Sequence, residues 1–112
     1  MMHLKEIKND KALIIEIEGR LDTTNFGQLE KKIFQAIESG NIRFVVDCGQ
    51  MDYVSSSGLR IFLMALKKTN GLEGSFLLCG LQESIREIFE ISGFTSIFGI
   101  YPSQQEALAS LA

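Results

Sequence analysis

The sequence contains few of the residues that build metal centres, disulfide frameworks or catalytic triads. Its 112 residues include one histidine, two cysteines, one proline and no tryptophan. With His3 as the only histidine, there are too few soft ligands for a zinc site, and we expect neither a metal nor a cofactor. Cys48 and Cys79 do not form a CxxC pair. They are therefore predicted to be two buried structural thiols.

Long apolar runs and an excess of basic residues are also missing. No run approaches the roughly 18 apolar residues of a membrane span, and the first residues, MMHLKEIKNDK, do not resemble a signal peptide. The net charge of −3 and the pI near 5.1 disfavour non-specific binding to nucleic acid or anionic membranes. We therefore expect a cytoplasmic protein with no membrane span and no direct contact with nucleic acid.

The chain contains neither an internal repeat nor a linker, so residues 1–112 are predicted to form a single domain. Period-two and helical hydrophobic patterns alternate along it. This alternation predicts an α/β domain with a mostly parallel sheet, whose helices lie mainly on one face. Strands are expected at about 4–7, 12–18, 42–48, 75–80 and 97–101, and helices at about 25–39, 57–69, 82–91 and 102–111.

The segment 44–68, FVVDCGQMDYVSSSGLRIFLMALKK, reads as strand, loop, serine cluster and helix. The expected inner stripe of this helix comprises Leu59, Phe62, Leu63 and Leu66. A second apolar side carries Ile61, Met64 and Ala65. Such a helix is either enclosed in its own domain or presents one face to another protein, and the pattern alone leaves both open.

The serine cluster has three possible interpretations. Ser55 or Ser56 could simply be the N-cap of the helix. A nucleophile would need a nearby base, and VSSSG does not match the G-x-S-x-G elbow, so hydrolase chemistry is not expected. A serine at a helix start can also accept a phosphate, which the backbone N–H groups and the dipole would stabilise. Because loops after parallel strands share one edge of the sheet, Asp22 is expected near the serines.

Three motifs, GRLD at residues 19–22, the segment 44–68 and ISGF at residues 91–94, resemble the STAS domain. More narrowly, they resemble the stand-alone bacterial anti-sigma-factor antagonists. The similarity covers essentially the whole chain, and YVSSSGLR with the upstream GRLD is its most specific part. It implies a single STAS-type domain with a four- to five-stranded, mostly parallel (mixed) sheet and about four helices.

The resemblance implies a non-enzymatic, phosphorylation-controlled partner switch. In the family, the unmodified antagonist binds an anti-sigma factor that is also a serine-protein kinase of the histidine-kinase-like ATPase fold, and this frees the sigma factor. The kinase phosphorylates the antagonist and so breaks the complex, and a PP2C-type phosphatase restores it. By position, the implied acceptor is Ser56.

The residues around that acceptor follow from the same resemblance. Ser55, Ser57, Gly58 and Asp22 would be the neighbours of the phosphosite. Ser55 stands where antagonists of the sporulation type have Asp, and it is a competing acceptor. The implied partner interface comprises Asp22, Thr23, Thr24, Ser57, Leu59, Arg60, Ile61 and Met64.

Two other functions compete with this one. The chain could be a STAS module that never carries phosphate, such as a scaffold or a subunit of a sensory or lipid-transport complex, with Ser56 as only a cap. It could also be a nucleotide-binding or hydrolytic protein, although Gly71-Leu72-Glu73-Gly74 lacks the spacing and the lysine of a nucleotide loop. The controlled sigma factor, the upstream signal and the oligomeric state do not follow from the sequence.

Overall fold

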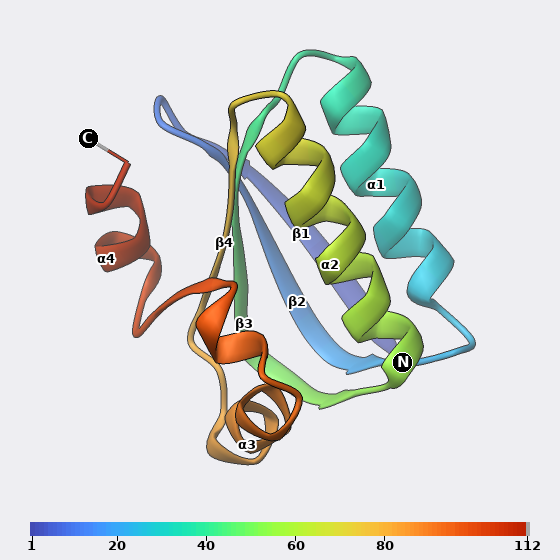
Figure 1. The fold of residues 1–112 in the computed structure, drawn as a ribbon. Coiled ribbons are helices and arrows are strands. Elements are labelled where there is room, and N and C mark those ends of the chain that lie inside the picture. The colour runs from blue at the N-terminus through green and yellow to red at the C-terminus, as the bar shows by residue number, and fades with distance from the viewer. Residues whose placement is uncertain (112) are drawn as a thin grey trace.

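The computed structural model describes residues 1–111, and a five-stranded mixed sheet forms its centre. In spatial order the strands are β1 (Met2–Lys8), β2 (Leu13–Leu21), β3 (Arg43–Val54), β4 (Ser75–Cys79) and β5 (Gly99–Tyr101). β1 is antiparallel to β2, and every other neighbouring pair is parallel (Figure 1). The predicted mixed, mostly parallel sheet is therefore confirmed.

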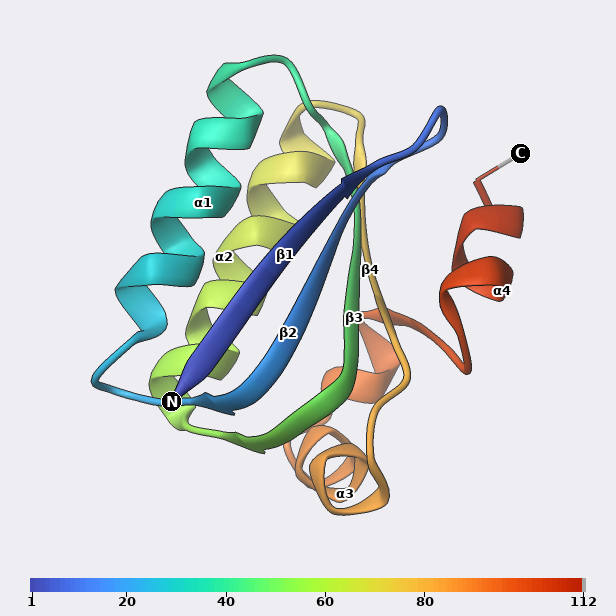
Figure 2. The same ribbon diagram turned by 180° about the vertical axis from the view of Figure 1, so that it is seen from behind.

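The helices cover the two faces of the sheet unequally. α1 (Phe26–Glu38) and α2 (Ser56–Gly71) lie side by side on one face, while Figures 1 and 2 show α4 (Gln104–Ala109) on the other. α3 (Glu83–Ile91) and the short 3₁₀ helix η1 (Phe94–Ser96) lie near the carboxyl end of β4. Within residues 1–111, no helix is long and apolar enough to cross a membrane.

The main core lies between the sheet and the helices α1, α2 and α3, and phenylalanines form its centre. The rings of Phe62 on α2 and Phe76 on β4 have centroids 6.1 Å apart, and Phe62 lies 6.3 Å from Phe89 on α3. Phe44 on β3 joins the same group at 6.2 Å from Phe76. Because aromatic pairs at these distances add to the free energy of burial, this cluster holds α2 in a fixed orientation on the sheet.

A smaller apolar cluster lies on the other face, under α4. It consists of Ala12, Ile14, Val45, Cys79 and Ala107. Beyond α4 this face is polar, since Glu18 on β2 is exposed. The helices therefore lie mainly on one face of the sheet, as the sequence predicts.

Three strands, β1, β2 and β3, are longer than the sequence predicts, and β3 differs most. The sequence predicts that the strand beginning near residue 42 ends at Cys48 and that a loop follows. In the structure, β3 continues to Val54. β2 continues beside it to Leu21, through register shifts near Glu16 and Gly19. The register shifts interrupt the regular alternation of buried and exposed residues that marks a strand in the sequence. The residues after Cys48 therefore look like a turn in the sequence, although they form part of β3.

The C-terminal part differs in detail from the prediction. The last strand begins at Gly99 rather than 97, because residues 94–96 form η1. Gly93 permits this turn with a φ of 78°, a conformation that favours glycine. The final helix begins at Gln104, where the Ser103 hydroxyl accepts a hydrogen bond from the Glu106 amide at 3.2 Å.

Candidate functional site

Two polar segments lie side by side where β2 and β3 end. We call residues 22–25 the Asp22 loop and residues 55–57 the serine segment. Leu21 pairs with Val54 in the sheet, and the Ser55 amide donates a hydrogen bond to the Leu21 carbonyl oxygen at 2.9 Å. The two segments are thus neighbours at one edge of the sheet, as the sequence predicts.

The three serines have different environments. Ser55 is the N-cap of α2, and its Oγ accepts a hydrogen bond from the Gly58 amide at 3.2 Å. Ser56 is the first helical residue and is exposed, and its hydroxyl makes no hydrogen bond with the part of the chain described. Ser57 follows and is half-buried. Capping therefore falls to Ser55 and leaves the Ser56 hydroxyl accessible.

The Asp22 loop is held by a local network of hydrogen bonds. The Asp22 Oδ1 atom accepts from the Thr24 hydroxyl at 2.6 Å and from the Thr24 amide at 2.9 Å. These bonds, with a smaller contribution from Arg20, hold the pKa of Asp22 below its ordinary value. The Arg20 Nε lies 3.5 Å from Asp22 Oδ2, and its guanidinium carbon lies 4.0 Å from the centroid of the Tyr53 ring.

The polar side chains of this loop do not cap α1. Asn25 occupies the N-cap position, but its side chain makes no capping hydrogen bond. Its Oδ1 accepts from the Asp22 amide at 2.9 Å, and its Nδ2 donates to the Arg20 carbonyl at 2.8 Å. Asn25 therefore fixes the shape of the loop, which leaves Thr23 and Thr24 exposed.

Gly58 sets how closely the start of α2 approaches the two strands. A Cβ atom at this position would lie 2.7 Å from Leu21 Cγ and 3.0 Å from Val54 Cγ2. Both neighbours are buried in the core. The glycine thus lets the serine segment pack directly against the end of β2.

The orientation of α2 corrects one part of the predicted interface. Ile61 is only 2% exposed and belongs to the core together with Phe62 and Ala65, so it is not available to a partner. Leu59 is half-buried. The side chains on the solvent side, which we call the outer face of α2, are those of Ser56, Arg60, Met64, Lys67 and Lys68.

Sequence reasoning missed two features of this chain. It identified neither Tyr53 nor its stacking with Arg20, because residue 53 was assigned to a loop rather than to a strand paired with β2. On the opposite face of the sheet, the Gln104 amide donates to Glu16 at 2.6 Å and to Asp47 at 2.7 Å. No local pattern could have joined these three residues, since α4 and β2 are distant in the sequence.

Within residues 1–111, neither the histidine nor the two cysteines lie where they could activate Ser56. His3 pairs with Glu18 and lines a hollow on the face of the sheet opposite to α1 and α2. The thiols of Cys48 and Cys79 are buried, and burial raises the pKa of both. The arrangement therefore presents an exposed hydroxyl next to an acidic loop that hydrogen bonds hold in shape.

Comparison with known proteins identifies the family. The family model of the STAS domain matches residues 3–107 of the chain. The chain is 39% identical over 109 residues to BtrV of Bordetella bronchiseptica, which is named as an anti-sigma factor antagonist, and the match covers 97% of this chain and 94% of the relative. The fold is also similar to that of several solved structures.

One is a Thermotoga maritima protein, described as an anti-sigma factor antagonist, with a TM-score of 0.93 at 18% identity over 96% of this chain and 93% of that one. Another is the Bacillus cell fate determinant SpoIIAA in its phosphorylated form, with a TM-score of 0.77 at 20% identity over 100% of both chains. The chain therefore belongs to the STAS domain family and, within it, to the anti-sigma factor antagonists.

Proposed function

We propose that this protein is a phosphorylation-controlled partner switch whose acceptor is Ser56. In its unmodified form it binds an anti-sigma factor that is also a serine-protein kinase of the histidine-kinase-like ATPase fold. Phosphorylation of Ser56 releases that partner, and a PP2C-type phosphatase reverses the reaction. The protein itself carries out no catalysis and acts in the cytoplasm.

One observation carries the proposal: Ser56 is exposed at the first position of α2 while Ser55 serves as the cap. A kinase can reach the Ser56 hydroxyl without displacing a hydrogen bond that the helix needs. Ser55 would have to release the Gly58 amide before it could accept a phosphate, which favours Ser56 between the two. Support of a different kind is that SpoIIAA, a protein of the same fold, is described in both unphosphorylated and phosphorylated forms.

The phosphate would act on the partner rather than on the fold. At the first position of a helix its charge of about −1.5 to −2 lies next to unpaired backbone N–H groups, which favour an anion. In a packed interface the same charge meets desolvation and repulsion of about 3 kcal/mol or more. That free energy corresponds to roughly a 100-fold loss of affinity.

The residues proposed to meet the partner surround Ser56. They are Asp22, Thr23, Thr24, Ser57, Leu59, Arg60 and Met64, and they come from the Asp22 loop and from α2. Thr23, Thr24, Arg60 and Met64 are exposed. The interface would therefore span both segments at this edge of the sheet.

Phosphotransfer and binding assays test the proposal together. The purified protein is incubated with the anti-sigma factor kinase of its own organism and ATP, and the product is mapped by mass spectrometry. Phosphate is expected on Ser56 and absent from a Ser56→Ala variant, with Ser39→Ala, at the exposed C-terminal end of α1, as the control that still accepts it. In a pull-down, Ser56→Ala should retain the anti-sigma factor and Ser56→Asp should lose it. Phosphate on another residue, or retention by Ser56→Asp, would contradict the proposed switch.

A further inference from the structure

α2 is a basic element in an acidic protein. The chain carries a net charge of −3. The 16 residues of α2, Ser56–Gly71, include Arg60, Lys67 and Lys68 but no aspartate or glutamate. The helix therefore bears a local charge opposite in sign to that of the whole molecule.

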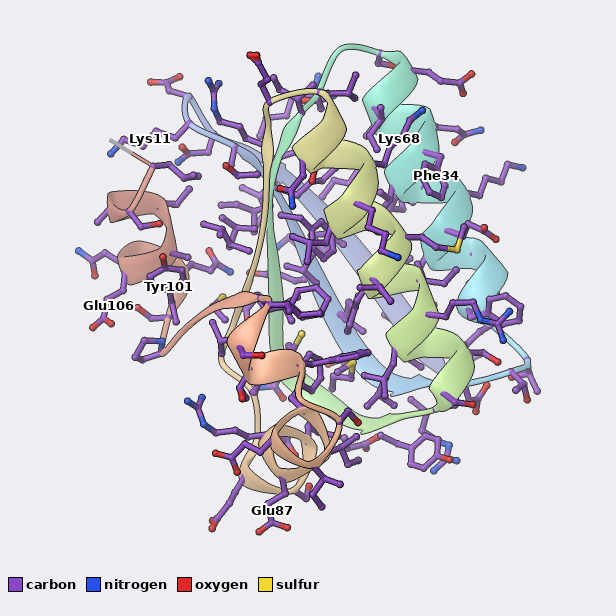
Figure 3. The ribbon with its side chains drawn as sticks, in the orientation of Figure 1. Lys11, Phe34, Lys68, Glu87, Tyr101 and Glu106 are labelled. Atoms are coloured by element: carbon purple, nitrogen blue, oxygen red, sulfur yellow. The ribbon has the colours of Figure 1, made fainter. Side chains whose placement is uncertain are left out.

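These charges gather on one side of the helix. At about 100° of rotation per residue, Ser56, Arg60, Met64, Lys67 and Lys68 fall within roughly one third of the circumference. All five are exposed, whereas Ile61, Phe62 and Ala65, which lie outside this sector, are buried. Figure 3 shows Lys68 beside α2, in the layer that α2 shares with α1. The outer face of α2 is thus one continuous surface that starts at Ser56.

The charges of this face are not used within the described part of the chain. The two salt bridges there join Arg20 to Asp22 and Lys32 to Glu6, and none involves Arg60, Lys67 or Lys68. Compensation of the helix dipole explains a cation in the last turn, such as Lys68. It does not explain Arg60, which lies in the second turn from the positive end of the dipole.

The only large apolar side chain on this face has the properties of a contact point. Met64 is 39% exposed and lies between Arg60 and the two lysines. Methionine adapts its shape to an apolar partner, and protein interfaces commonly surround a buried apolar anchor with a polar rim. Solubility alone would explain the exposed basic residues, but it would not explain an exposed methionine among them.

We propose that the outer face of α2 docks an acidic protein surface that holds an apolar seat for Met64. This rests on the proposed function, since the acidic surface is assigned to the anti-sigma factor. A protein fits this face better than a nucleic acid does, because duplex-binding proteins typically neutralise about 6–10 phosphates. Only three cations are present here, on a molecule with a net charge of −3.

The proposal also explains why a phosphate at Ser56 would be effective. Ser56 lies on the same face as Arg60, one helical turn before it. A phosphate of about −1.5 to −2 would cancel most of the positive charge that this face offers. The phosphate would then repel the acidic surface of the partner, which the unmodified face attracts.

Charge-reversal variants test the inference. Binding of the unphosphorylated protein to the purified anti-sigma factor of its organism is measured by calorimetry at about 50 mM and about 300 mM NaCl. Arg60→Glu and the double variant Lys67→Glu/Lys68→Glu should each weaken binding at least about tenfold at low salt, with a smaller loss at high salt. Met64→Ala should weaken binding at both salt concentrations.

Lys11→Glu is the matched control, with the same change of charge. Lys11 is exposed in the turn before β2, at the end of that strand opposite to Leu21, and Figure 3 shows it far from α2. It should bind within about twofold of the wild type. Urea unfolding of each variant confirms that these exposed substitutions leave the fold intact.

Different failures point to different errors. If Ser56→Asp abolishes binding while Arg60→Glu and the double lysine variant bind like the wild type, the acidic-partner inference is wrong and the proposed switch stands. If the wild type does not bind the anti-sigma factor, or Ser56→Asp binds equally well, the proposed function itself fails. Binding of the wild type to phosphatidylserine vesicles or RNA that Arg60→Glu removes would also overturn the inference.

Discussion

Replacing Gly58 with alanine tests whether close packing holds the serine segment in place. The added methyl group would lie 2.7 Å from Leu21 Cγ, 2.9 Å from Leu21 Cδ2 and 3.0 Å from Val54 Cγ2. Leu21 is fully buried and Val54 is 4% exposed, so neither side chain can swing into solvent. The strand end and the start of α2 must therefore move apart.

Two effects of opposite sign determine the size of the change. Overpacking of a buried site costs about 1–3 kcal/mol. Alanine gains up to about 1 kcal/mol over glycine in a helix interior, and less near a helix end. The net expectation for Gly58→Ala is a loss of about 1–2 kcal/mol in the free energy of unfolding, or a decrease in Tm of about 4–8 °C.

Gly27→Ala is the matched control. Gly27 is also near the start of a helix, α1, but a Cβ atom there would have no atom within 4 Å apart from its chain neighbours and the adjacent backbone of α1. This variant should be as stable as the wild type or slightly more stable. Both are measured by urea unfolding, with the slope of the transition expected to stay unchanged. A Gly58→Ala protein as stable as Gly27→Ala would refute the packing argument.

Three further predictions concern the cap, the thiols and the acidic loop. Ser55→Ala should lower the free energy of unfolding by about 1 kcal/mol and Ser56→Ala by less than about 0.5 kcal/mol; equal losses in urea titrations would contradict the assignment of the cap. Burial raises the pKa of Cys79 to about 12, so iodoacetamide at about pH 8 should label it only as the protein unfolds, and rapid labelling of the native protein would show that it is accessible. The hydrogen bond from the Thr24 side chain is the main reason that the pKa of Asp22 lies below its ordinary value of 3.8. The Asp22 carboxylate therefore stabilises the fold above pH 3.8, and this contribution is lost as the pH falls through the lower pKa of the folded state. An NMR titration should find a higher Asp22 pKa in Thr24→Val, and an unchanged value would argue against the hydrogen bond as the main cause.

The alternation of strands and helices could be predicted because each element carries its own hydrophobic period. Ala12 to Glu18 alternates as a half-buried strand should, and the structure buries Leu13, Ile15 and Ile17 in the main core. The same reasoning failed for residues 49–54. Their ladder depends on the register shifts with β2, which only the paired strands together determine.

The orientation of α2 shows a second limit. Two apolar stripes share this helix, and the prediction placed the inner one on Leu59, Phe62, Leu63 and Leu66. The structure instead buries Gly58, Ile61, Phe62, Ala65 and Thr69. Gly58 and Thr69 carry no hydrophobic signal, and their burial follows from close contact with Leu21 and from hydrogen bonds of the Thr69 hydroxyl to the carbonyls of Ala65 and Leu66. The rotation of the helix could therefore not be read from hydrophobicity alone.

The candidate site was easier to predict than the helix that supports it. The meeting of the Asp22 loop and the serine segment follows from parallel topology, because strands that run the same way end at the same edge. The division of roles between Ser55 and Ser56 could not be predicted, since it depends on where α2 begins. A difference of one residue decides which hydroxyl caps the helix and which remains exposed.

We propose that a phosphate on Ser56 releases the partner without disturbing the fold. The most direct test of this proposal is a calorimetric titration of the anti-sigma factor with the unmodified protein and with the protein phosphorylated at Ser56 alone. We expect a Kd at least about 100-fold higher for the phosphorylated form, together with an unchanged or slightly higher unfolding midpoint. Equal affinities for the two forms would contradict it.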